Sequence, residues 1–128
     1  MRESSLELLA PRADVWAFLT EPYHLSDWWP GITGVEPDVR GFAPGARWKV
    51  HATKRNIFVG RRGVETMLLI REIDPFERWT WHLLKPATDV EIRLRTVAED
   101  RTEVTVTGGD ANRAVKRLYD LVQTAATV

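Results

Sequence analysis

The chain has few side chains that could carry out acid-base or metal chemistry. Its three histidines are His24, His51 and His82, and their positions match no HExxH motif or other metal-ligand spacing. His24 lies three residues before Asp27, and such a pair could transfer protons. Helix capping or simple exposure is the alternative role for the pair. The chain contains no cysteine, which excludes disulfides, thiolate catalysis and zinc-thiolate sites. We therefore predict no metal, no cofactor and no catalytic residue.

A basic segment from Lys54 to Arg62 is the second candidate for a ligand-binding feature. It carries four cationic residues around the apolar run Ile57 to Val59. One interpretation is a solvated hairpin with a charged tip. The other is a lid over a cavity, with Phe58 against a ligand and an arginine paired with an acidic group.

Composition restricts the classes of protein to which the chain could belong. Lys plus Arg equals Asp plus Glu, at 18 each, so no long-range attraction to nucleic acid or to an anionic membrane is expected. Hydrophobic residues make up 44% and charged residues 28%, as in globular proteins. No run has the length of a signal peptide or of a membrane span. We expect a single domain over residues 1–128, cytoplasmic, with no membrane insertion and an undetermined oligomeric state.

The elements that would position a site can be read from the periodicity. Apolar Val15, Trp16 and Leu19 recur at helical spacing behind Pro11, which suits a first helical position. A second short helix ends before Pro30. Alternating patterns and turn residues then predict further strands. Together with a first strand, the predicted strands are residues 4–9, 33–39, 47–53, 64–73, 78–84, 89–97 and 102–107.

Several strands have one apolar face and one polar face. Trp79 and Trp81 alternate with Thr80 and His82, which is typical of an antiparallel sheet with one buried side. A sheet of this kind must cover its apolar face. The candidate cover is a helix from Asp110 to Val128. It carries a stripe of alanine, valine and leucine, while Lys116, Arg117, Asp120 and Gln123 take the outer side.

Several short motifs in this order carry a family resemblance. They are Ala10, Pro11, Val15, Trp16 and Leu19 after the first strand, then Trp28, Trp29 and Pro30, then Pro44 and Gly45, and finally Ile70, Ile73, Asp74, Pro75, Trp79 and Trp81. In this arrangement the chain resembles the SRPBCC superfamily of START, Bet v 1 and polyketide cyclase-like proteins. The resemblance implies an α+β helix-grip fold, in which a curved, seven-stranded antiparallel sheet surrounds a C-terminal helix and two short helices follow the first strand.

The same resemblance implies an internal cavity for a small hydrophobic or aromatic ligand, lipid-like or polyketide-like. The inward faces of the predicted elements would line it. The predicted ligand-binding residues are Trp48, Val50, Thr66, Leu68, Ile70, Trp79, Trp81, Ile92, Leu94, Leu118 and Val122. Two alternatives remain open at this point: a polyketide cyclase or dehydratase, and a partner-binding module with a filled core.

Overall fold

The computed structural model describes residues 2–56, 60–84 and 87–127. In chain order the elements are β1 (Glu3–Leu8), α1 (Arg12–Thr20), the 3-10 turn η1 (Pro22–His24), α2 (Leu25–Trp28), β2 (Ile32–Glu36), β3 (Arg47–Asn56), β4 (Gly60–Asp74), β5 (Arg78–Leu83), β6 (Thr88–Ala98), β7 (Arg101–Thr107) and α3 (Ala111–Thr127). None of the described helices has the length and apolar character needed to cross a membrane.

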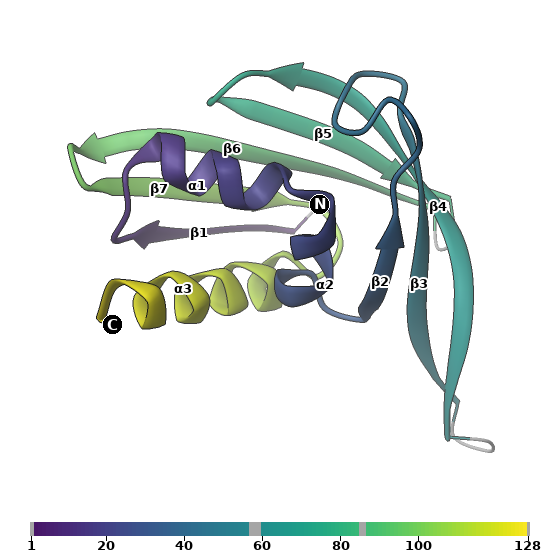
Figure 1. The fold of residues 1–128 in the computed structure, drawn as a ribbon. Coiled ribbons are helices and arrows are strands. Elements are labelled where there is room, and N and C mark those ends of the chain that lie inside the picture. The colour runs from purple at the N-terminus through teal and green to yellow at the C-terminus, as the bar shows by residue number, and fades with distance from the viewer. Residues whose placement is uncertain (1, 57–59, 85–86, 128) are drawn as a thin grey trace.

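The strands form one seven-stranded antiparallel sheet, as the resemblance implied. Their order is β1-β7-β6-β5-β4-β3-β2, so consecutive strands from β2 to β7 are neighbours and β1 joins at the far edge. The sheet curves strongly, and α1, α2 and α3 lie within its curve (Figure 1). This arrangement confirms the predicted helix-grip fold.

The apolar stripe of α3 faces the body of the protein. Ala111, Ala114, Val115 and Leu118 are buried, and the helix packs against β1, β7 and α2. Because the small alanines lie near its N-terminal end, the helix can approach the other elements closely there. The helix therefore covers part of the apolar face that the strand pattern requires to be covered.

The register of β5 agrees with the predicted alternation. Trp79 and Trp81 are buried, at 0% and 1% exposure, and Thr80 and His82 lie on the opposite face. Trp79 pairs with Ile92 of β6, and Trp81 pairs with Val90. Both partners are buried, so the concave face is apolar where β5 meets β6.

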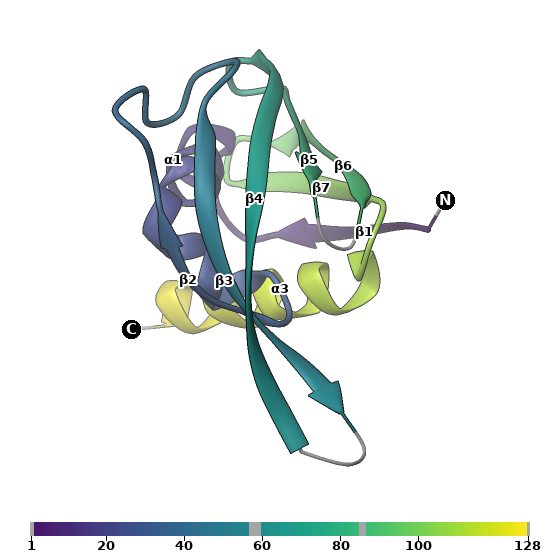
Figure 2. The same ribbon diagram turned by 90° about the vertical axis from the view of Figure 1, so that its right-hand side faces the viewer.

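Two local predictions need correction. Pro11 is the residue before α1 rather than its first helical residue, because the helix begins at Arg12. The strands predicted over 47–53 and 64–73 extend toward each other, because β3 and β4 continue as a ladder in which Asn56 pairs with Gly60. Figure 2 shows β3 and β4 continuing as a two-stranded arm beyond α3. Phe58, for which a ligand contact was predicted, lies outside the described residues. So do Lys85 and Pro86, between the strands predicted over 78–84 and 89–97.

Candidate functional site

A cavity of about 590 Å³ lies between the concave face of the sheet and the N-terminal half of α3. We call it the sheet–helix cavity. Its size is within the range of small-molecule sites, which is roughly 300–1,000 Å³. The turn after α2 and strands β2, β3, β5 and β6 supply most of its wall. It is lined by Trp29, Pro30, Gly31, Ile32, Thr33, Ala52, Thr53, Trp81, Leu83, Thr88, Val90, Gly109, Asp110, Arg113 and Arg117.

Two indoles form the aromatic part of this wall. The rings of Trp29 and Trp81 meet edge to face, with centroids 5.2 Å apart. Trp81 in turn contacts Trp79 at 4.6 Å, and Trp79 contacts Trp48 at 5.9 Å, so the cavity wall is continuous with a packed aromatic core. Rigid rings of this kind give a flat ligand contact area at a small entropic cost.

Two glycines let the backbone at the edges of the cavity lie close to neighbouring residues. Gly109 has a φ of +57°, and a Cβ atom there would lie 2.9 Å from the ring of Trp29. Only glycine lets the chain pass this indole without displacing it. Opposite, the amide of Thr53 donates to the carbonyl of Gly31 at 2.9 Å, which fixes the turn after α2 to β3. The rim of the cavity is therefore positioned by backbone contacts.

The charged residues in the cavity wall all lie at the start of α3 or on it. Asp110 precedes the helix, and its carboxylate lies 3.8 Å from a guanidinium nitrogen of Arg113. The side chains of Asp110 and Arg113 are 49% and 66% exposed, so solvent screens this contact. Arg117 follows one turn later on the same wall and is also exposed. Arginine forks at such a position can receive a carboxylate in bidentate geometry.

The residues that the sequence predicted for ligand binding divide into three groups. Trp81 lines the sheet–helix cavity. Leu118 and Val122 line a separate groove between α1 and α3, with a volume of about 360 Å³. The others are buried in the core: Trp48, Val50, Thr66, Leu68, Ile70, Trp79, Ile92 and Leu94.

Most of the cavity wall was missed by sequence reasoning. Ala52, Leu83 and Val90 continue the same alternating faces as the predicted residues, two positions nearer the strand ends. Alternation could therefore have found them, but it does not say where along the strands the space opens. Arg117 was assigned to the outer side of the helix. It is exposed, and it lines the cavity as well.

The histidines have local roles in this structure. His24 stacks on Phe18 with ring centroids 4.3 Å apart, and its Nδ1 lies 3.0 Å from the Phe18 carbonyl oxygen. His51 contacts Glu36 at 2.7 Å, and His82 contacts Asp89 at 2.8 Å, both on the outer face. None of the three lines the sheet–helix cavity. In the described part of the chain, no group of three metal-binding side chains comes together.

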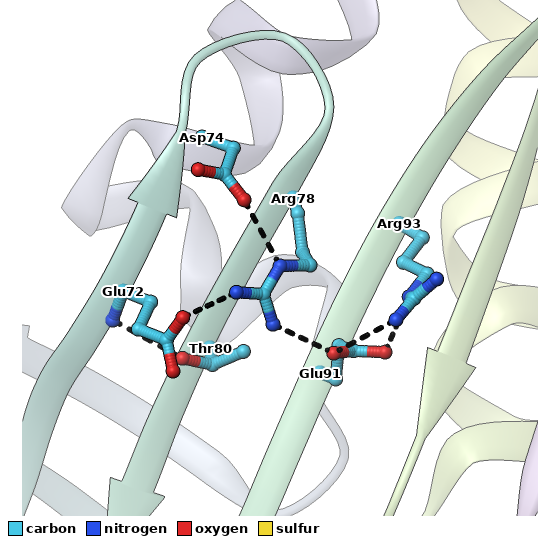
Figure 3. Close-up of polar contacts among 6 residues, drawn as sticks. All are labelled: Glu72, Asp74, Arg78, Thr80, Glu91 and Arg93. Carbon is cyan, nitrogen blue, oxygen red and sulfur yellow. Dashed lines mark hydrogen bonds and ion pairs between the residues drawn. The ribbon is translucent and has the colours of Figure 1, made fainter.

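The convex face of the sheet carries a network of ion pairs, which we call the outer-face network (Figure 3). The guanidinium of Arg78 contacts Asp74 at 3.0 Å and Glu91 at 2.9 Å, and also contacts Glu72. These contacts raise the pKa of Arg78, with the hydrogen bond to Asp74 as the largest cause. The hydrogen bonds from Arg93 and Arg78 lower the pKa of Glu91. Each charged group in this network contacts at least one group of opposite charge.

Comparison with known proteins supports the fold. The model of the family described as "Activator of Hsp90 ATPase homolog 1-like protein" matches residues 9–125. No curated protein sequence gives a significant match.

Solved structures give further matches over nearly the whole chain. A START superfamily protein from Mycobacterium smegmatis has a TM-score of 0.73 at 10% identity and covers 97% of each chain. The di-domain ARO/CYC StfQ from the steffimycin biosynthetic pathway has a TM-score of 0.70 at 19% identity, over 98% of this chain and 45% of that one. Ara h 8.0201 has a TM-score of 0.61 at 17% identity, over 98% and 89%. At these identities the likeness establishes the fold.

Proposed function

Because the chain belongs to the family of activator of Hsp90 ATPase homolog 1-like proteins, we propose that it binds a small hydrophobic or aromatic molecule between its sheet and its C-terminal helix. The observation that carries this proposal is the sheet–helix cavity, with the indoles of Trp29 and Trp81 in its wall. Apolar burial against these rings would supply the affinity.

The proposal gives different roles to the predicted ligand-binding residues. Trp81 would contact the ligand over a small part of its surface, since it lines the cavity and is 1% exposed. Trp79 and Trp48 would form the support behind it, because both are fully buried. A ligand that reached them would have to displace packed aromatic rings.

The test uses the neutral dye N-phenylnaphthylamine, whose fluorescence rises in apolar sites. We expect binding to quench tryptophan emission and to depend little on salt, because burial drives it. Ala52→Phe should fill part of the cavity from β3 and abolish most of the binding. The matched control is Val39→Phe, which adds the same ring at a fully exposed position. Absence of dye binding, or equal binding by both variants, would overturn the proposal.

A cyclase or dehydratase acting on a polyketide-like substrate is a second candidate. It is favoured by Asp110, whose carboxylate lies in the cavity wall where it could accept a proton. An enzyme of this kind should lose turnover in Asp110→Asn while it still binds the neutral dye. Unchanged turnover in this variant would remove Asp110 from the chemistry.

A partner-binding module is a third candidate. It is favoured by the central core, where Trp48 and Trp79 are completely buried and Phe42 packs against both. For such a module, Ala52→Phe should leave partner binding intact.

A further inference from the structure

Two cations lie in the wall of the sheet–helix cavity. Arg113 and Arg117 are four residues apart on α3, so they project from the same side of the helix, and both line the cavity. Like charges at this spacing oppose each other and slightly destabilise a helix. A helix that only needed to pack on the sheet would gain nothing from this pair.

These two charges are also poorly compensated. Arg113 has the distant and exposed contact with Asp110. Within the described residues, Arg117 makes no ion pair. By contrast, Arg78, Arg93 and Arg95 on the outer face each contact at least one carboxylate within 3.2 Å.

The strand segments that continue from the cavity wall are basic in sequence. Ala52 and Thr53 of β3 line the cavity, and the next two rungs of the hairpin pair Lys54 with Arg62 and Arg55 with Arg61. No carboxylate occurs between Ala52 and Val64. The sequence that follows the β3 part of the cavity wall is therefore net positive in a chain of zero net charge, which favours an anion over a cation as ligand.

We propose that the ligand of the sheet–helix cavity is an amphipathic organic acid. Its apolar body lies against Trp29 and Trp81, and its carboxylate or sulfonate is held by Arg113 and Arg117. The acid replaces Asp110 as the partner of Arg113 and relieves the repulsion between the two arginines. This inference rests on the proposed function, since it assigns the chemical class of the same ligand.

The experiment compares two dyes that differ by one group. Anilinonaphthalene sulfonate carries a sulfonate that N-phenylnaphthylamine lacks. We expect Arg113→Gln and Arg117→Gln each to lower the affinity for the sulfonate dye by about three- to five-fold, as for loss of an exposed charge pair. The neutral dye should bind both variants as it binds the parent protein. Lys116→Gln is the control, because it removes one cation from the same helix at a position outside the cavity wall.

Two further measurements sharpen the test. Asp110→Asn should strengthen binding of the sulfonate dye, since it removes the carboxylate that competes for Arg113. Rising salt concentration should weaken binding of the sulfonate dye and leave binding of the neutral dye unaffected.

The outcomes separate this inference from the proposed function. If neither dye binds, or if Ala52→Phe does not block them, the cavity is not the site and both ideas fail. If both dyes bind in the cavity and the arginine variants change the affinity of neither dye, the proposed function stands, and the inference that the ligand is an organic acid is wrong. An equal loss in Lys116→Gln would show that general charge, and not the cavity arginines, attracts the sulfonate.

Discussion

Two groups of arginines, one on each side of the sheet, have opposite surroundings. On the convex face, Arg78 is three-quarters buried and contacts three carboxylates. On the concave side, Arg113 and Arg117 are exposed at the edge of a cavity with one distant carboxylate between them. A guanidinium with several short ion pairs is already satisfied by the fold. One without such partners is available to a ligand, so the difference separates structural charge from binding charge.

Removal of α3 should have the largest effect, because it changes the concave side of the sheet and leaves the convex face as it is. A chain ended before Asp110 would leave the apolar concave face uncovered, while the outer-face network would stay complete. We expect loss of the cooperative thermal transition and aggregation, because exposed ion pairs contribute little stability. A truncated protein that remained monomeric and melted sharply would show that the convex face alone can hold the sheet.

Tryptophan substitutions should distinguish the packed part of the concave face from the cavity wall. Trp79→Ala should cost about 3–5 kcal/mol of unfolding free energy, because the ring is fully enclosed. Trp81→Ala should cost somewhat less, about 2–3 kcal/mol, since this ring, although only 1% exposed, lies in the cavity wall rather than in the centre of the aromatic core. Chemical denaturation measures both values.

A milder substitution provides the control for Trp79. Its indole Nε1 has no hydrogen-bond partner within the described structure, so Trp79→Phe removes ring volume but breaks no hydrogen bond. This variant should be clearly more stable than Trp79→Ala. If Trp81→Ala were the more damaging of the two alanine variants, the cavity would not reach that ring.

The fold could be predicted from the sequence because its signals are local. Alternation in Trp79 to His82, the turn at Asp74 and Pro75, and the glycines before Asp110 each fix one element. The residues on the dry face follow from the period of two. These signals repeat along the chain, and together they leave few possible orders of strands.

The cavity could not be located in the same way. Sequence patterns assign a side chain to a face, but the open volume depends on how far α3 stands from each strand. Gly109, for example, fits against Trp29, an approach between distant segments that no strand pattern indicates. The space opens at Ala52, Leu83 and Val90 rather than at Trp48 and Trp79.

Substitution of one arginine from each group should give a smaller difference, measured as melting temperature, than the tryptophan substitutions. Arg78→Gln should lower the melting temperature, because it leaves Asp74, Glu72 and Glu91 close together without their shared cation. Arg117→Gln should leave the melting temperature unchanged or slightly raise it, since it relieves repulsion with Arg113. Differential scanning calorimetry checks both. A large loss of stability in Arg117→Gln would show that this residue has a structural role.

The smallest expected effect is the response of the outer face to acid. Hydrogen bonds from Arg93 and Arg78 lower the pKa of Glu91 below its usual value. The hydrogen bond with His51 does the same for the pKa of Glu36. A lowered carboxylate pKa contributes stability above the unfolded-state pKa of about 4.3, and that stability is lost as the pH falls through the folded-state pKa.

Melting temperature should therefore decline below about pH 4. Glu91→Gln should lower stability at neutral pH and reduce the decline in acid, whereas Glu99→Gln in the exposed β6–β7 turn serves as the charge control. If the acid response were the same in all three proteins, Glu91 would not contribute to it.

The position of β1 beside β7 also has a consequence for how the protein is made. The hydroxyl of Ser5 contacts that of Thr105, 100 positions later, at 2.7 Å, whereas β2 through β7 pair with the strands next to them in sequence. At roughly 5–20 residues per second, a ribosome needs about 5–20 s to produce the partner of β1 after β1 itself. The entropy of closing so long a loop delays the pairing further. The earliest of the seven strands to be synthesised is thus the one that waits longest for its neighbour.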